Sequence, residues 1–135
     1  IPIPSYQQLA GVVTSSNHAS STLRNIPDVA SESAAQQYMC ANGTCRNFGG
    51  GTSYAAPLWA SLIAMANQQA ASRGAARVGF LNPTLYGIAT GSGFGSDFHD
   101  ITTGNNGAYL AVRGYDLVTG WGSPIGVSLI NALAP

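Results

Sequence analysis

The sequence predicts an irregular α/β arrangement built around one long, buried helix. Residues 52–73 carry a helical pattern in which apolar side chains cover more than one face of the segment. Short segments elsewhere alternate apolar and polar residues or contain hairpin signals, which is typical of strands. The chain also contains 17 glycines and 7 prolines, and this content indicates many turns between the short elements.

Charged side chains are rare, at 7% of 135 residues with a net charge of zero. Average soluble domains carry about a quarter charged residues. Binding to nucleic acid needs a basic surface, so the composition argues against that class of partner. A chain with 45% hydrophobic residues and so few charges is also unlike a disordered one. No apolar run reaches the roughly 18 residues of a membrane span, and we expect a soluble chain with no membrane partner.

Residues 1–27 are predicted to be mostly loop. Ile1-Pro2-Ile3-Pro4 has neither an initiator Met nor a signal-peptide pattern, and we expect a processed end inside a longer molecule. Residues 9–14 are strand-like within a segment rich in Ser, Asn and Thr. Residues 26–30 predict a short strand or a turn.

A β-hairpin is predicted over residues 36–49. Asn42-Gly43 is a strong two-residue hairpin signal, and the hairpin brings Cys40 and Cys45 within disulfide reach. Two cysteines at this spacing form neither a zinc site nor a C-x-x-C redox motif, so a structural disulfide is favoured over two free thiols. A disulfide implies an oxidising compartment. Asn42-Gly43-Thr44 is also a glycosylation sequon, which matters if the chain is secreted from a eukaryotic cell.

The helix predicted at 52–73 has Pro57 in its first turns, where the missing N–H group costs little, and Gly74 ends it. Its apolar residues predict burial on nearly all sides. After it we expect a turn into a short helix over 79–86, loop over 87–107, a strand over 109–112 and a terminal helix over 127–133.

Ser53 follows Gly49-Gly50-Gly51-Thr52 at the start of this helix. Unpaired N–H groups and the positive end of the helix dipole favour an oxyanion there, which suits a nucleophile that attacks an acyl group. The alternative is that Thr52 or Ser53 is a helix N-cap, and the local pattern alone favours the cap over a nucleophile. A nucleophile also needs a base, and no neighbouring residue supplies one.

Asp100 and Asp116 lie on either side of a Gly- and Asn-rich stretch, residues 104–107. Two carboxylates with free loop carbonyls beside them suit a hard cation such as calcium, although the EF-hand spacing is absent. The alternative is that both aspartates cap turns. His18 and His99 lack a motif around them and are predicted to be surface or loop histidines.

Residues 51–57, Gly-Thr-Ser-Tyr-Ala-Ala-Pro, resemble the nucleophile motif shared by subtilisins and sedolisins. Further stretches resemble sedolisins alone, in matching order and rough spacing: residues 4–7, 26–29, 79–83, 98–104 and 114–124. Together they cover nearly the whole chain. Residues 1–135 therefore resemble the C-terminal third or so of the catalytic domain of a sedolisin, an acid-acting serine-carboxyl peptidase.

The resemblance implies a subtilisin-like three-layer α/β fold with a central parallel sheet, of which this chain forms only the C-terminal portion. It implies that Ser53 is the nucleophile. In sedolisins a Glu oriented by an Asp is the base and another Asp forms the oxyanion hole. None of the five acidic residues matches those motifs. A companion N-terminal chain of the same precursor, a zymogen, is expected to supply them, and the substrates are peptides or proteins.

The resemblance also implies one Ca²⁺ ion. Its ligands are the side chains of Asp100 and Asp116 and the backbone carbonyls of Ile101, Val112 and Gly114. Val112 stands where the family usually has Gly. Glu32 is interpreted as a residue that lines a cleft, in a segment that departs from the family's pattern, residues 30–35. A secreted protein is expected, with a lysosome-like acidic compartment as the other location.

Two other functions remain open at this point. The chain is alternatively a non-catalytic, calcium-binding structural module of the same fold. It is also compatible with a fragment of a subtilisin-type serine protease whose His and Asp lie outside this sequence, and activity near neutral pH would distinguish that enzyme.

Overall fold

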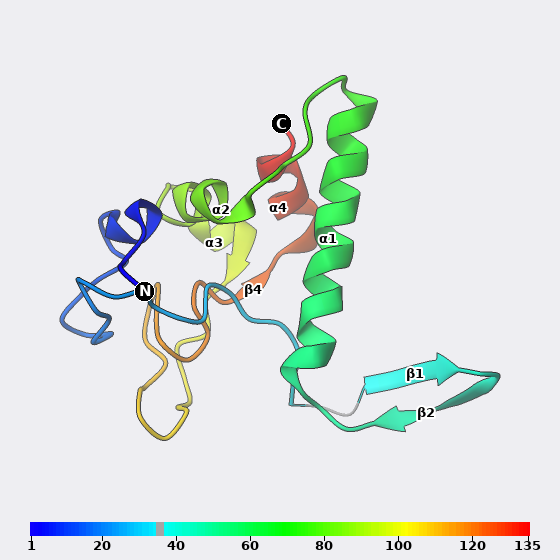
Figure 1. Ribbon diagram of the computed structural model, residues 1–135, viewed down its shortest axis with the longest axis horizontal. Coiled ribbons are helices and arrows are strands. Elements are labelled where there is room, and N and C mark those ends of the chain that lie inside the picture. The colour runs from blue at the N-terminus through cyan, green and yellow to red at the C-terminus, as the bar shows by residue number, and fades with distance from the viewer. Residues whose placement is uncertain (35–36) are drawn as a thin grey trace.

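The computed structural model describes residues 1–34 and 37–135 (Figure 1). It is a mixed arrangement of helices and short strands, compatible with part of an α/β domain. In chain order the elements are the 3-10 helix η1 (Ser5–Gln8), strands β1 (Gln37–Ala41) and β2 (Thr44–Phe48), helices α1 (Thr52–Ser72), α2 (Leu81–Ala89) and α3 (Phe94–Asp97), strands β3 (Phe98–His99) and β4 (Ser123–Pro124), and helix α4 (Gly126–Leu133).

The strands form two small antiparallel sheets, β1–β2 and β3–β4. The parallel sheet of the expected three-layer fold is not formed by the described residues. No helix of the described residues is long and apolar enough to cross a bilayer.

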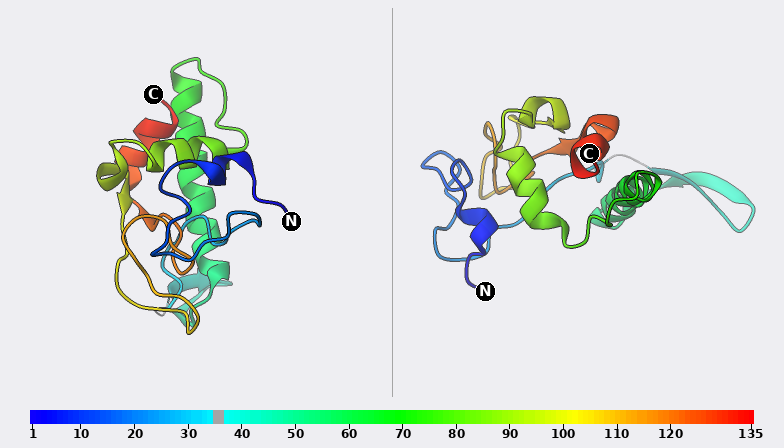
Figure 2. Two further views of the ribbon diagram at one scale, coloured as in Figure 1. Left: turned by 90° about the vertical axis from the view of Figure 1, so that its left-hand side faces the viewer. Right: turned by 90° about the horizontal axis from the view of Figure 1, so that it is seen from above.

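Helix α1 matches the predicted segment to within one residue at its end. The prediction that it is buried on nearly all sides is wrong for this chain. Only Leu62, Ala66 and Ala70 are buried, whereas Leu58 and Met65 are 47% and 49% exposed. Helix α4 packs against one face of α1, and Figure 2 shows that no other described helix covers the opposite side, where only the hairpin β1–β2 extends past the start of α1. The apolar surface of α1 is thus larger than the described part of this chain covers.

The core lies between η1, α2, α3, α4 and the buried face of α1, and a group of aromatic rings stands at its centre. Tyr86, Tyr115 and Trp121 meet with ring centroids 5.6 to 5.9 Å apart, and Phe98 and Leu129 are fully buried near them. Tilted and edge-to-face pairs of this kind add to the free energy gained by burying the rings. We call η1, α2, α3, α4 and the loops that join them the body of the molecule.

The predicted hairpin is confirmed, except that Gln36 at its expected start lies outside the described residues. Strands β1 and β2 pair with Cys40 opposite Cys45, and these two residues form a disulfide. Asn42 and Gly43 both have positive φ, as the tight turn between two directly paired strands requires. The hairpin extends away from the body, next to the start of α1 (Figure 2).

The loop regions differ most from the sequence-based expectation. Residues 9–14 form turns and not a strand, and 109–112 contribute only an isolated bridge between Asn105 and Leu110. Residues 87–107 are not all loop, because α2 continues to Ala89 and is followed by α3 and β3. The short helix over 79–86 and the terminal helix over 127–133 are confirmed as α2 and α4. Residues 26–30 form no strand and are irregular, with bends at Ile26 and Asp28.

Candidate functional site

Ser53 is the second residue of α1, and its side chain is exposed. The N-cap residue is Gly51, and no side chain caps the helix. The interpretation of Thr52 or Ser53 as a capping residue is therefore wrong, because both lie inside the helix. In the described part of the chain the Ser53 hydroxyl has no hydrogen-bond partner, so it is free to meet a group from outside.

The backbone before Ser53 lies against the segment that contains Ser33. The Gly51 N–H donates to the Ser33 carbonyl oxygen at 2.6 Å. A Cβ atom on Gly50 would collide with the same carbonyl, so this approach requires a glycine. The amides of Thr52 and Ser53 donate no hydrogen bond to any residue that the structure describes. The positive end of the helix is thus open to an anion.

A cavity of about 490 Å³ lies beside the first turns of α1. One wall is formed by the helix, through Thr52, Ala55, Ala56 and Trp59, and the opposite wall by residues between Pro27 and Ser33. None of its lining residues is charged. A second cavity, of about 530 Å³, lies on the other side of the same segment and is lined in part by Glu32, as the sequence analysis expected for that residue.

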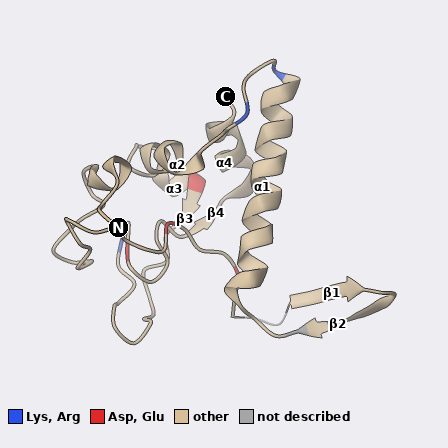
Figure 3. Cartoon of the chain, viewed as in Figure 1, with Lys and Arg blue, Asp and Glu red and all other residues tan. Residues whose placement is uncertain are grey.

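No described carboxylate or imidazole hydrogen-bonds to Ser53. His18 is exposed in a loop and His99 is exposed on β3, as expected, and neither imidazole has a hydrogen-bond partner among the described residues. Asp28, Asp97, Asp100 and Asp116 bind groups elsewhere in the chain. Figure 3 shows how sparse and scattered the charged residues are. A complete acid–base pair for Ser53 does not arise from the residues that the structure describes.

The two aspartates of the predicted metal loop hold the same short segment. Asp116 accepts the Val112 N–H at 3.0 Å, and Asp100 accepts the Gly114 N–H at 3.0 Å. The backbone carbonyls of Ile101, Val112 and Gly114 accept no hydrogen bond within the described chain, which leaves their oxygens available to a cation. No cluster of three or more His, Cys, Asp or Glu side chains occurs among the described residues, so a cation here depends on carbonyl oxygens.

Asp116 also caps a turn. Its buried carboxylate accepts the N–H groups of Val118 and Thr119 at 2.9 and 2.7 Å. The turn-capping interpretation is therefore correct for this residue. With the Val112 N–H and the Thr119 hydroxyl the donors number four, as many as the lone-pair positions of a carboxylate, so a metal ion at Asp116 would have to displace at least one of them.

A buried polar network that the sequence analysis missed holds the segment next to the cavity. The Asp28 carboxylate pairs with Arg24 at 2.5 Å and accepts the Tyr86 hydroxyl at 2.8 Å, and Gln7 donates to that same hydroxyl. Tyr115 donates to the Pro27 carbonyl oxygen at 2.9 Å. Burial raises the pKa of Tyr86 well above its ordinary value and that of Tyr115 to about 12. In the sequence, residues 26–28, Ile-Pro-Asp, were the one local feature that pointed to this part of the chain.

The chain matches no family model. It is 41% identical to kumamolisin of Bacillus sp. (strain MN-32) over 142 aligned residues, which cover 99% of this chain and 24% of kumamolisin. It is 36% identical to tripeptidyl-peptidase sed1 of Aspergillus fumigatus over 75% of this chain and 15% of that protein. It is 30% identical to tripeptidyl-peptidase 1 of Bos taurus over 98% of this chain and 26% of that protein. The chain thus spans about a quarter or less of the length of these curated relatives.

Proposed function

Because the chain belongs to the sedolisin family of serine-carboxyl peptidases, we propose that residues 1–135 are the C-terminal part of an acid-acting catalytic domain with Ser53 as its nucleophile. The reaction is the hydrolysis of a peptide bond within peptides or proteins. The observation that carries the proposal is the state of Ser53, which is exposed, has no hydrogen-bond partner among the described residues, and lies next to two free amides at a helix start without a side-chain cap.

In the proposed reaction the Ser53 oxygen attacks the carbonyl carbon of the scissile bond. Its proton passes to a glutamate, and the carbonyl oxygen takes up the developing negative charge. The free N–H of Ser53 and a protonated aspartate donate hydrogen bonds to that oxygen. The proton then moves to the leaving nitrogen, and water hydrolyses the acyl group on Ser53 by the same steps in reverse.

The glutamate, the aspartate that orients it and the oxyanion aspartate come from a companion N-terminal part of the same precursor. This chain supplies only five acidic residues, and the four described aspartates are engaged elsewhere. A carboxylate base, with an ordinary pKa near 4, works in acid, where an imidazole base would be protonated. The disulfide fits secretion or an acidic, oxidising compartment.

We also propose that the loop from Asp100 to Asp116 binds one Ca²⁺ ion. Two carboxylates and three unbonded carbonyl oxygens, from Ile101, Val112 and Gly114, form the oxygen-only set that this cation prefers. The ion would neutralise the two carboxylates and tie both ends of the loop together. Val112 takes part through its carbonyl oxygen alone, so its side chain does not prevent the role.

The test compares Ser53→Ala with Ser61→Ala in the complete catalytic assembly. Ser61 lies on the same helix, and its hydroxyl only donates to the Pro57 carbonyl oxygen. Ser53→Ala is expected to lower peptide hydrolysis at pH 4 by about 10⁴-fold or more, because the nucleophile is lost. Ser61→Ala should retain it.

Each alternative predicts a different outcome. If the unchanged assembly folds and hydrolyses nothing, the chain is a structural module. Activity that depends on Ser53 but is confined to neutral pH identifies a subtilisin-type enzyme. Activity that survives Ser53→Ala contradicts every function in which this serine is the nucleophile.

A further inference from the structure

We propose that Trp59 is a positioning residue for the nucleophile. Its indole N–H holds an extended segment, residues 28–33, and this segment in turn holds the backbone at Gly51, two residues before Ser53. We call residues 28–33 the strap. The inference rests on the proposed role of Ser53, and it adds a residue outside the reacting groups on which the rate should depend.

The strap is anchored firmly to the body at its first residues. The Asp28 carbonyl oxygen accepts the backbone N–H of Trp121 at 3.0 Å, and the backbone N–H of Ala30 donates to the Gly122 carbonyl oxygen at 2.9 Å. The Asp28 side chain adds the ion pair with Arg24 and the hydrogen bond from Tyr86. Backbone and side-chain bonds thus fix this end of the strap on the same turn that follows the proposed metal loop.

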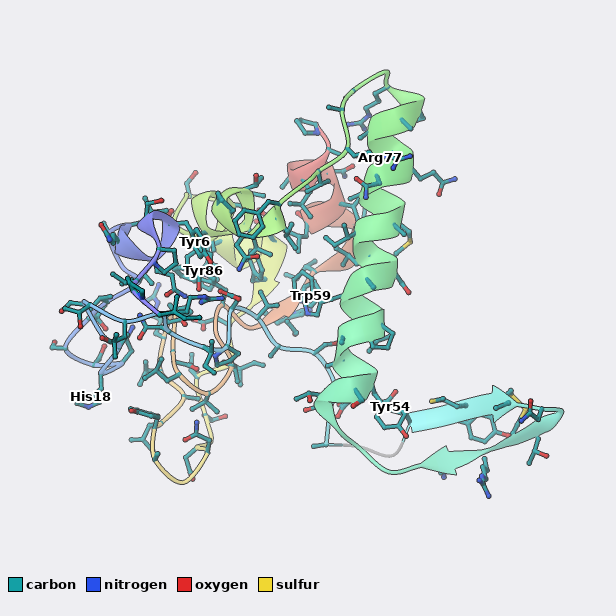
Figure 4. The ribbon with its side chains drawn as sticks, in the orientation of Figure 1. Tyr6, His18, Tyr54, Trp59, Arg77 and Tyr86 are labelled. Atoms are coloured by element: carbon teal, nitrogen blue, oxygen red, sulfur yellow. A yellow bond between two sulfur atoms is a disulfide. The ribbon has the colours of Figure 1, made fainter. Side chains whose placement is uncertain are left out.

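The strap meets α1 through two hydrogen bonds. The Trp59 Nε1–H donates to the Ala30 carbonyl oxygen at 2.9 Å, and the Gly51 N–H donates to the Ser33 carbonyl oxygen at 2.6 Å. Figure 4 shows Trp59 on the side of α1 that faces the body. Between the two bonds lies the cavity of about 490 Å³, so close packing does not set the distance between strap and helix. The hydrogen bonds therefore have to set it.

The start of α1 has no other such connection. In the first turns of the helix, Trp59 is the one side chain that hydrogen-bonds to the strap among the residues that the structure describes. The remaining side-chain bonds lie near the other end, where Gln69 and Arg73 both donate to the Ala134 carbonyl oxygen. Loss of the Trp59 bond would therefore let the strap move relative to α1 and loosen the remaining bond at Gly51, close to Ser53.

The experiment removes this one hydrogen bond and keeps the ring. In the complete catalytic assembly, Trp59 is replaced by benzothienylalanine, which has sulfur in place of the indole N–H. A second variant, Trp59→Phe, removes the indole altogether. Trp121 provides the matched control. It is 3% exposed, and its Nε1 atom has no hydrogen-bond partner in the part of the chain that the structure describes. The same sulfur replacement at Trp121 deletes an N–H group without breaking a bond.

Two readouts distinguish positioning from general stability. The sulfur replacement at Trp59 is expected to lower kcat about tenfold with KM within about twofold, because a small displacement of a reacting group costs rate more than binding. It should also speed hydrogen exchange at the Gly51 amide about fivefold or more, because that amide loses its fixed acceptor. Trp59→Phe should show both effects, and the Trp121 replacement neither.

If the two sulfur replacements give the same kcat and the same Gly51 exchange, Trp59 does not position the nucleophile. Hydrogen exchange needs no catalysis, so it tests the contact between the strap and Gly51 even if Ser53 is not the nucleophile. Activity that survives Ser53→Ala would instead overturn the proposed function. The two failures are therefore distinguishable.

Discussion

At the scale of single residues, two buried tyrosines hold the start of the strap. Tyr86 donates to the Asp28 carboxylate, and Tyr115 donates to the Pro27 carbonyl oxygen. Both phenol rings belong to the aromatic core, so each side chain links the packing of the body to the backbone that leads towards Ser53. A phenol can do this only while it is protonated, because a phenolate has no proton to donate.

The raised pKa of Tyr115 predicts how stability changes in alkali. Burial raises this pKa to about 12, whereas an unfolded tyrosine titrates near 10. The unfolded chain therefore loses its proton first. The stabilisation is complete below about pH 10 and is lost as the pH rises from about 10 to about 12. We expect Tyr115 alone to contribute a fall of about 2 kcal/mol in the free energy of unfolding over this range, measured by urea denaturation.

Two variants check this assignment. Tyr115→Phe should show a clearly smaller fall between pH 10 and 12, although Tyr86 still contributes. Tyr38→Phe should behave like the unchanged chain, because Tyr38 is 70% exposed. An identical pH dependence in Tyr115→Phe and the unchanged chain would show that Tyr115 is not the titrating group.

At the scale of elements, the hairpin β1–β2 is a separate unit closed by its own disulfide. Its strands pair only with each other within the described residues. Replacing both cysteines, as Cys40→Ser with Cys45→Ser, is expected to destabilise the hairpin by about 2 kcal/mol, because a short loop is no longer closed in the unfolded state. Hydrogen exchange should become faster in the hairpin amides and stay the same in α2 and α4. Equal acceleration in α2 would contradict the independence of the hairpin.

The metal loop gives the second prediction at this scale. Addition of Ca²⁺ is expected to raise Tm, and Asp116→Asn should weaken Ca²⁺ binding at least tenfold in calorimetry, because one of only two carboxylates is lost. Asp97→Asn is the control, since Asp97 is also buried but binds the Ser128 hydroxyl on α4. Undiminished Ca²⁺ binding by Asp116→Asn would show that Asp116 is not a ligand and only caps the turn.

The elements that the sequence predicts well are those with a local cause. Helix α1 has long helical periodicity, and the hairpin has Asn-Gly between its strands. Residues 109–112 alternate like a strand, but only Leu110 forms a β-bridge, with Asn105. The alternation is therefore present in the sequence although no sheet forms there. Helix α3 and strand β3 were missed because distant contacts hold them. Asp97 accepts the Ser128 hydroxyl, and its carbonyl oxygen accepts the Ile125 N–H.

The candidate site divides in the same way. The motif predicts the location of Ser53 at a helix start, and the structure places it there. The strap was not predicted, because most of its bonds join residues far apart in the sequence, such as Trp59 with Ala30 and Tyr86 with Asp28. No sequence periodicity records contacts of that kind. The free amides beside Ser53 were expected from the helix start, whereas the cavity depends on how the strap and α1 approach each other.

At the scale of the whole molecule, α1 stands out because its 21 residues include no charged side chain. The rest of this chain covers α1 on one face, through α4. A helix without a charged face is typical of a protein interior. Leu58 and Met65 add exposed apolar surface to it. These features, together with the roughly fourfold greater length of the relatives, support a larger assembly in which α1 is covered and Ser53 meets its carboxylates.

The most direct test of this account is the mass of the species that carries peptidase activity, measured by light scattering on fractions assayed at pH 4. The account predicts activity only in a species much heavier than the 13.8 kDa of this chain, because the base and the oxyanion aspartate lie outside it. Denaturation and reduction should then show whether they lie on a second polypeptide. Peptidase activity that coincides with a 13.8 kDa species would contradict the account, because Ser53 would then act without them.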